Sequence, residues 1–113
     1  MIDYKAILSK YCAGNTELLH ILLTHSRQVA DRALTILAAH PEWVESGEVD
    51  PVFVEEAAML HDIGVVLCDA PKIHCLGTHA YIEHGYLGAE ILRQEGLPKH
   101  AQVAERHTGT GIT

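Results

Sequence analysis

Apolar residues along the chain recur at intervals of three and four positions, and the strict alternation of apolar and polar residues typical of strands is nearly absent. The clearest stripe has spacings of 4, 3, 4, 4 and 3 and comprises Leu18, Leu22, His25, Val29, Ala33 and Ile36. This spacing places residues on one face of an α-helix. The pattern therefore predicts an all-α fold.

Capping residues, prolines and glycines divide the pattern into five predicted helices. We expect these helices at about residues 2–12, 16–40, 51–62, 79–94 and 98–106. Asn15 or Thr16 is placed to cap the second helix, and Asp50 followed by Pro51 is a typical start for the third. Gly64 is expected to end that third helix.

The segments between the helices predict loops within a single domain. Residues 45–48 are expected to form a polar loop, and residues 65–78 an irregular loop that holds one short turn of helix. A chain of 113 residues has the size of one domain. We therefore expect a compact bundle of about five helices over residues 1–113, with a helix in 1–12 as an N-terminal extension of a core at 16–113.

Charge and apolar run length argue against nucleic acid as the main partner and against a membrane. The net charge is −7, with 8 Lys and Arg against 15 Asp and Glu, so the chain lacks the basic stripe that nucleic-acid binding requires. Apolar runs are too short for a membrane span, and the start of the chain does not have the pattern of a signal peptide.

The three cysteines form no C-x-x-C pair. A cytoplasmic protein with reduced thiols is expected.

The histidine content points to metal chemistry. The chain has nine histidines against one Trp, four Tyr and one Phe. Four predicted helices each carry one histidine on the apolar face, namely His25, His61, His84 and His107. Burying polar groups without partners costs about 1–3 kcal/mol each, and a shared cation with a carboxylate satisfies them together. Asp62, at a helix C-terminus where the dipole favours positive charge, is the candidate carboxylate.

Three segments of the chain resemble a known family. His25 followed by H-D-I-G at residues 61–64 resembles the HD superfamily of metal-dependent phosphohydrolases, in its HDIG variety. H-G-Y-L-G-A-E at 84–90 and E-R-H-T-G at 105–109 are similar to segments of its dinuclear members. Those members include bacterial symmetrical diadenosine tetraphosphate hydrolases and, more loosely, cyclic-dinucleotide phosphodiesterases. The resemblance covers residues 16–113.

The resemblance implies a set of metal ligands and an activity. It implies that His25, His61 and Asp62 bind one metal, that His84 and His107 bind a second, and that the Asp62 carboxylate bridges them. His61 and Asp62 would be the catalytic pair. The implied protein is a hydrolase that uses a metal-activated hydroxide on a nucleotide or other small phosphoester. Ligands of this type suit one or two divalent ions of Fe, Mn, Ni or Zn.

Two departures from the family pattern affect the expected site. The family supplies a last aspartate from a helix after H-T-x-G, whereas this sequence stops at Thr113. Water, an anion or Asp69 would then complete the first metal, and a surface without its last helix would favour a homodimer. The family often has a lysine after H-D-I-G, where this chain has Val65. The alternative function is a non-catalytic metal- or nucleotide-binding regulatory HD domain.

Other polar residues receive weaker assignments. His79, Lys72 and Arg106 are the candidates for binding the substrate. A zinc site at His74, Cys75 and His79 would lack a fourth ligand. The remaining residues are expected at the surface, at helix ends or in ordinary packing, and they are His20, His40, His100, the acidic pair Glu55 and Glu56, Tyr81 and Tyr86.

Overall fold

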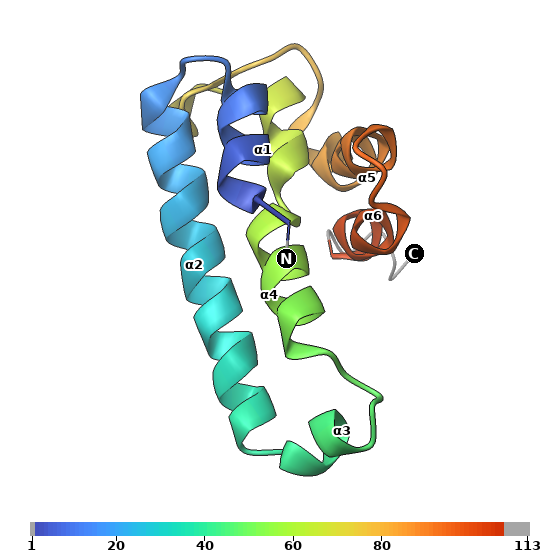
Figure 1. The fold of residues 1–113 in the computed structure, drawn as a ribbon. Helices are drawn as coiled ribbons and strands as arrows, with labels where there is room; N and C mark the ends of the chain where they lie inside the picture. The colour runs from blue at the N-terminus through green and yellow to red at the C-terminus, as the bar shows by residue number, and fades with distance from the viewer. Residues whose placement is uncertain (1, 108–113) are drawn as a thin grey trace.

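The computed structural model describes residues 2–107, which form six α-helices, three short 3₁₀ segments and one small hairpin (Figure 1). The helices are α1 (Tyr4–Cys12), α2 (Thr16–Ala38), α3 (Pro41–Glu45), α4 (Pro51–Leu60), α5 (His84–Gln94) and α6 (Pro98–Arg106). The 3₁₀ segments are η1 (Ile63–Leu67), η2 (Pro71–Ile73) and η3 (Tyr81–Glu83), and the strands are β1 (Asp69–Ala70) and β2 (Cys75–Leu76). The prediction of an all-α bundle is confirmed.

Side chains cap the N-termini of α2 and α4 at the residues that the sequence predicted. The Asn15 side chain accepts a hydrogen bond from the Leu18 amide at the start of α2. The Asp50 side chain accepts one from Val52 at the start of α4, whose first residue is Pro51. Such caps satisfy amide groups that have no partner within the helix. These local signals lie within a few residues of each helix end, which is why the sequence shows them.

Several predicted boundaries are wrong. The second helix ends at Ala38, two residues early, and a separate short helix begins at Pro41 because a proline ring clashes with the preceding helical turn. The fourth predicted helix begins at His84, because residues 81–83 form a 3₁₀ turn instead. Residues 65–78 are more ordered than an irregular loop, since they contain 3₁₀ turns and the hairpin that pairs β1 with β2.

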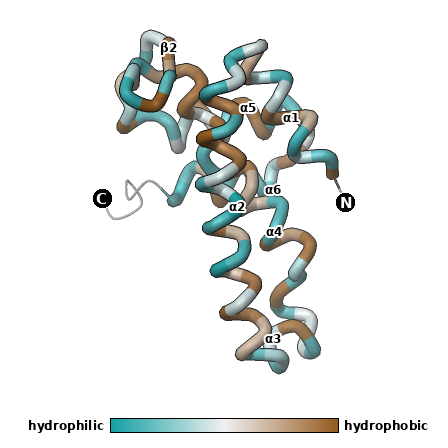
Figure 2. The backbone as a smooth tube through the Cα atoms, turned by 90° about the vertical axis from the view of Figure 1, so that its left-hand side faces the viewer, coloured by the Kyte–Doolittle hydropathy of each residue, from teal (hydrophilic) through white to brown (hydrophobic). Residues whose placement is uncertain are grey.

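The helices form two packed groups. In Figure 1, α2 and α4 run side by side in opposite directions, α1 lies against their upper half, and α5 and α6 pack together beside α4. Teal and brown positions alternate along α2 in Figure 2, as expected for an amphipathic helix. The core between the groups comprises chiefly Leu8, Leu18, Leu22, Leu60, Ile63, Val65, Leu92 and Ala101.

Gly64 permits a very close approach between η1 and α5. A Cβ atom at this position would collide with the carbonyl oxygen of His84 and lie 2.5 Å from the amide nitrogen of Gly88. The prediction that Gly64 ends the third helix is therefore wrong, because α4 already ends at Leu60 and Gly64 is buried inside η1. Its missing side chain instead lets the start of α5 lie against residues 61–64.

Glu56 and His100 form a buried pair between α4 and α6. Their residues are 6% and 9% exposed, and Nε2 of His100 lies 3.0 Å from Oε1 of Glu56. The second carboxylate oxygen accepts a hydrogen bond from the Ile2 amide at 2.9 Å. The expectation that Glu56 is solvated and His100 lies at the surface is wrong, because helix α6 and the N-terminal segment cover this face of α4. Glu55 is half-buried and bonds to Tyr4.

We predict that His100→Ala lowers the free energy of unfolding by about 1–3 kcal/mol, because it leaves a buried carboxylate oxygen without its partner. Urea unfolding measures the change. His20→Ala, at an exposed position of α2, is the control and should stay within about 0.5 kcal/mol of the wild type. Equal effects of the two substitutions would contradict this role of the pair.

Among the helices of residues 2–107, none combines the length and the apolar composition needed to cross a membrane.

Candidate metal centre

The Asp62 carboxylate lies at the centre of four histidine side chains from different parts of the fold. His25 comes from the middle of α2, and His61 directly follows α4. His84 is the first residue of α5, and His107 directly follows α6. The structure thus brings together all five residues that the sequence selected as metal ligands.

Each oxygen of Asp62 contacts one pair of histidines. Oδ2 lies 3.0 Å from Nε2 of His25 and 3.0 Å from Nε2 of His61. Oδ1 lies 2.8 Å from Nε2 of His107 and 3.2 Å from Nε2 of His84. Within residues 2–107, this gives two three-residue sets that share Asp62, and in each set the candidate ligand atoms lie within 4.8 Å of one another.

Backbone geometry after α4 explains how neighbouring residues face one point. Asp62 has φ −100° and ψ 11°, in the bridge region between helical and extended conformations. This turn between α4 and η1 redirects the chain, so that His61 and Asp62 both face the centre although they are adjacent in sequence. The C-terminal end of α4 also favours positive charge at this place.

Backbone carbonyl groups hold three of the histidine rings. Nδ1 of His61 bonds to the carbonyl oxygen of Ala58. Nδ1 of His84 lies 2.7 Å from the carbonyl oxygen of Tyr81, and Nδ1 of His107 lies 2.6 Å from that of Ala104. A carbonyl oxygen only accepts hydrogen bonds, so each Nδ1 carries a proton. The neutral ring then presents the lone pair of Nε2 to the centre.

The converging atoms form a set of electron-pair donors. Nε2 of His84 and Nε2 of His107 lie 3.1 Å apart, and both face the Asp62 carboxylate. With neutral rings, lone pairs would meet lone pairs and an anion, which is unfavourable unless a proton or a cation lies among them. Nitrogen and carboxylate oxygen without thiolate are ligands that suit divalent transition metals. The residues therefore fit the metal that the sequence predicted.

Protonation equilibria reflect the same charge arrangement. Without a metal, protons on the Nε2 atoms take the place of the cation. Burial opposes ionisation of Asp62, but the hydrogen bonds that His107, His61 and His84 then donate outweigh it and hold the pKa of this carboxyl far below its usual range. Burial lowers the pKa of His61 and of His84, but their bonds to Asp62 outweigh burial and raise both. The centre therefore keeps a negative carboxylate and attracts positive charge, whether protons or metal ions.

His25 is more exposed than its place in the predicted apolar stripe implied. Its side chain is 53% exposed, although Nε2 still reaches Asp62. The buried positions of α2 are Leu18, Leu22, Ser26, Ala30 and Leu37. They follow mainly a four-residue spacing because α2 packs along α4, so the prediction that His25 lies in the buried stripe is wrong. His25 instead stands at the open edge of the centre.

A cavity of about 230 Å³ adjoins the centre at Asp62 and His25. Its other lining residues are Leu18, Ile21, Leu22, Val65, Ile73 and Tyr81. No role beyond packing was expected for Tyr81 from the sequence. Its backbone carbonyl holds His84 and its ring centre lies 4.5 Å from that of His84. The sequence does contain a signal for this contact. Tyr81 precedes the candidate ligand His84 by three residues, and at that spacing a helical turn directs the Tyr81 carbonyl group toward the His84 ring.

The residues proposed for substrate binding lie elsewhere. Arg106 lines a separate cavity with Phe53 and Lys99. His79 forms an exposed ion pair with Glu83 at 3.0 Å, and Lys72 is exposed in η2. None of the three lines the cavity at Asp62. Asp69 is exposed in β1 and belongs to neither ligand set, while Thr108 and Gly109 of the H-T-x-G segment lie outside the described residues.

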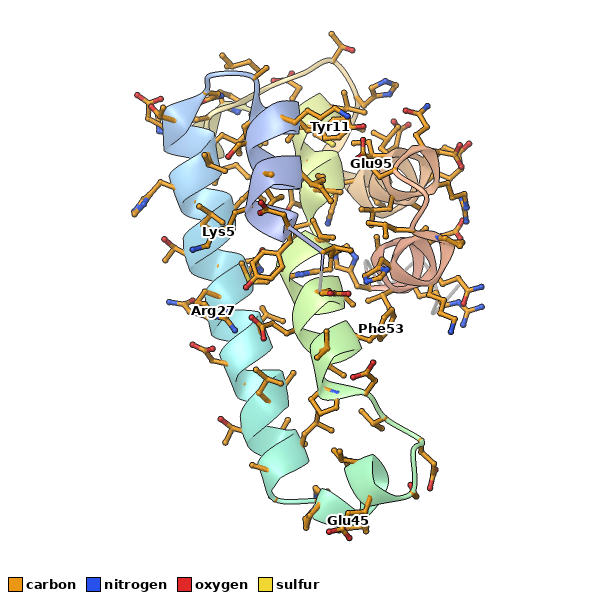
Figure 3. The ribbon with its side chains drawn as sticks, viewed as in Figure 1. Lys5, Tyr11, Arg27, Glu45, Phe53 and Glu95 are labelled. Carbon is orange, nitrogen blue, oxygen red and sulfur yellow. The ribbon has the colours of Figure 1, made fainter. Side chains whose placement is uncertain are left out.

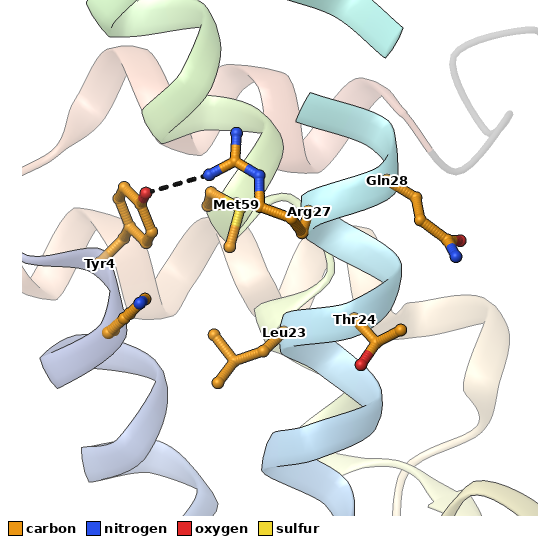
Figure 4. Close-up of a pocket in the computed structure, with 7 residues that line it drawn as sticks. Tyr4, Leu23, Thr24, Arg27, Gln28 and Met59 are labelled. Atoms are coloured by element: carbon orange, nitrogen blue, oxygen red, sulfur yellow. Dashed lines mark hydrogen bonds between the residues drawn. The ribbon is translucent and has the colours of Figure 1, made fainter. Parts of the chain in front are cut away.

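A larger cavity lies between α1 and α2, with a volume of about 470 Å³ (Figure 4). Lys5 and Arg27, which line this cavity, are labelled in Figure 3. The Arg27 guanidinium already bonds to Glu55 at 3.1 Å and to Asp31 at 2.9 Å, and it donates to the Tyr4 hydroxyl. Because Arg27 is already paired with carboxylates and none of the lining residues belongs to either ligand set, this cavity does not mark the candidate site.

Comparisons with known proteins match the part of the chain that contains this centre. The model of the HD domain matches residues 22–113. A protein of Methanocaldococcus jannaschii, itself named only as uncharacterized, is 37% identical over 109 residues, which are 96% of this chain and 53% of that protein. The chain thus spans about half the length of this relative. No solved structure matches the chain.

Proposed function

Because the chain belongs to the HD domain family, a superfamily of metal-dependent phosphohydrolases, we propose that it hydrolyses a nucleotide or another small phosphoester at the Asp62 centre. One observation carries the proposal. The Nε2 atoms of four histidines surround both oxygens of one buried carboxylate. Purely structural histidines would not need to converge on a single charge with their lone pairs.

The two ligand sets give each residue a role. His25, His61 and Asp62 would hold one divalent ion, and His84 and His107 would hold a second that shares Asp62. Ions of Fe, Mn, Ni or Zn suit these ligands. Bound there, they supply positive charge to phosphoryl oxygens and acidity to the attacking water.

The residues of the chain themselves orient the centre before any substrate arrives. Before metal binds, Asp62 stays ionised, because hydrogen bonds from the protonated histidine rings hold its pKa far below neutral pH. The carbonyl oxygens of Ala58, Tyr81 and Ala104 keep the three rings from turning. Histidine ligands that backbone carbonyl groups already hold in place need little reorganisation during the reaction. The negative net charge is no obstacle, because the phosphate would meet positive charge locally at the centre.

A screen for metal content and turnover tests the proposal. Purified protein is loaded with Mn²⁺ or Fe²⁺, its metal is measured by elemental analysis, and phosphomonoesters, nucleotides and dinucleoside polyphosphates are offered as substrates. We expect up to two ions per chain and hydrolysis that a chelator abolishes. Metal-loaded protein that hydrolyses none of these esters would contradict the proposed activity.

One observation favours a regulatory domain as the second candidate. The part of the cavity lining that the structure describes contains no Lys or Arg, and Val65 lies where related enzymes often carry a lysine. A regulator would bind metal and a nucleotide without turning it over. Thermal stabilisation by a nucleotide, combined with no phosphate release in the same screen, would favour this second function.

Metal should stabilise the folded chain. A ligand present at 100 times its dissociation constant adds about 2.7 kcal/mol to the free energy of unfolding, which corresponds to a rise in melting temperature of about 10 °C or more. Thermal melting of chelator-treated protein with and without Mn²⁺ measures the rise. We expect His61→Ala to lose most of it and His79→Ala, at an exposed position, to retain it. The same rise in both variants would place the metal elsewhere.

A further inference from the structure

The cavity beside Asp62 has one polar end and otherwise apolar walls. We propose that the centre acts on phosphate esters of a small apolar alcohol, a single aromatic ring or a short branched chain, and that this alcohol part occupies the cavity. The inference rests on the proposed hydrolase function and names its substrate class.

The walls come from four separate segments that meet at the centre. Helix α2 contributes Leu18, Ile21 and Leu22, while η1, η2 and η3 contribute Val65, Ile73 and Tyr81 respectively. Every one of these side chains is aliphatic except that of Tyr81. The apolar lining is therefore a product of the whole fold and is not confined to one exposed helix face.

The ionisable groups of the cavity determine in which orientation a phosphate ester would bind. Asp62 and His25 line it, and both belong to the proposed metal site. Lys and Arg are missing from its described lining, so the walls offer a phosphate no cation of their own. The phosphoryl group would consequently sit at the centre, and the group esterified to it would extend along the apolar walls.

The polarity and size of the cavity select the alcohol. The hydroxyl groups of a sugar or polyol would lose their hydrogen bonds to water and find few partners here. An apolar group gains by leaving water. Typical pockets for drug-sized ligands measure roughly 300–1,000 Å³, and about 230 Å³ holds a smaller group. The Tyr81 ring, beside the His84 ring, offers a face against which an aromatic group can pack.

The reaction is a simple hydrolysis. The oxygen of water forms a bond to phosphorus, the bond between phosphorus and the alcohol oxygen breaks, and the alcohol leaves with a proton supplied by that water. The products are the apolar alcohol and inorganic phosphate. No oxidant, reductant or second substrate is needed.

Matched esters test the substrate class. Benzyl phosphate and 3-methylbutyl phosphate are compared with glycerol 3-phosphate, because all three leaving groups are primary alcohols. We expect kcat/KM for the two apolar esters to exceed that for glycerol 3-phosphate by about tenfold or more, since differences of this size follow from a few apolar contacts. Equal or reversed values would overturn the inference and leave the hydrolase function standing.

A binding comparison decides the inference even if no ester is hydrolysed. Benzylphosphonate and methylphosphonate share the same charged group and are not hydrolysed. Calorimetry with Mn²⁺-loaded protein should show benzylphosphonate binding about tenfold more tightly. If turnover is absent but this preference is present, the proposed activity fails and the apolar cavity stands. Equal affinities would overturn the assignment of the cavity.

Two variants test whether the cavity wall causes the preference for benzylphosphonate over methylphosphonate. Ile73→Ser adds a polar group to the cavity wall at a half-buried position, and Leu76→Ser is the control at a residue that is 80% exposed and outside the lining. We expect Ile73→Ser to reduce the benzylphosphonate preference several-fold with unchanged metal content, and Leu76→Ser to keep it. An undiminished preference in folded Ile73→Ser protein would overturn the proposal.

Discussion

Asp62→Ala is expected to weaken metal binding by at least about 100-fold, more than any substitution of a single histidine in the cluster. Loss of groups that merely support metal ligands already costs about 10–100-fold in affinity. Asp62 contacts all four histidines and would be shared by both ions. Removing it takes away the one negative charge that residues 2–107 bring to the two ligand sets, and with it a ligand of each ion.

Titration of chelator-treated protein with Mn²⁺ or Zn²⁺, followed by elemental analysis after dialysis, measures this loss. His79→Ala is the matched control, because His79 pairs with Glu83 and belongs to neither ligand set. Asp62→Asn separates charge from shape, and we expect it to resemble Asp62→Ala. If the Asp62 and His79 variants lose metal equally, the ligands have been assigned wrongly.

Gly64→Ala is expected to have the largest effect on stability, lowering the free energy of unfolding by about 3 kcal/mol or more. Overpacking a buried site typically costs about 1–3 kcal/mol and occasionally more. Here the added methyl group would collide with the backbone of His84 and Gly88, which cannot turn away as a flexible side chain can. Moving α5 to make room would displace His84 from Asp62, so metal affinity should fall as well.

Gly14→Ala is the control for this substitution. Gly14 has φ +87° and open space around it, so alanine there meets backbone strain without a collision. A cost of about 1–2 kcal/mol is expected from the left-handed conformation alone, with metal binding unchanged. Urea unfolding and metal titration of both variants provide the comparison. A Gly64→Ala protein as stable as the Gly14→Ala protein would show that α5 can shift at little cost.

The local features of the fold were predictable because their causes lie within a few residues. Asn15 and Asp50 cap the helices that follow them, and Pro51 begins the helix at which it was expected. The identity of the five central residues was also within reach of the sequence. Histidine spacing singled them out, and the resemblance of His25, the H-D-I-G segment and the segments around His84 and His107 to a known family implied the ligand set, although His25 does not lie in the buried stripe.

Tertiary packing decided the remaining features, because they depend on which surfaces meet. The sequence alone determined an all-α chain and selected Asp62 with the four histidines that surround it. Only the packing of α6 against α4 made Glu56 and His100 a buried pair, and only the contact of η1 with α5 gave Gly64 its role. The exposure of His25 and the apolar cavity likewise arise where segments distant in sequence come together. Local periodicity indicates which face of a helix a residue lies on. Which neighbour that residue contacts is decided only when the helices pack together.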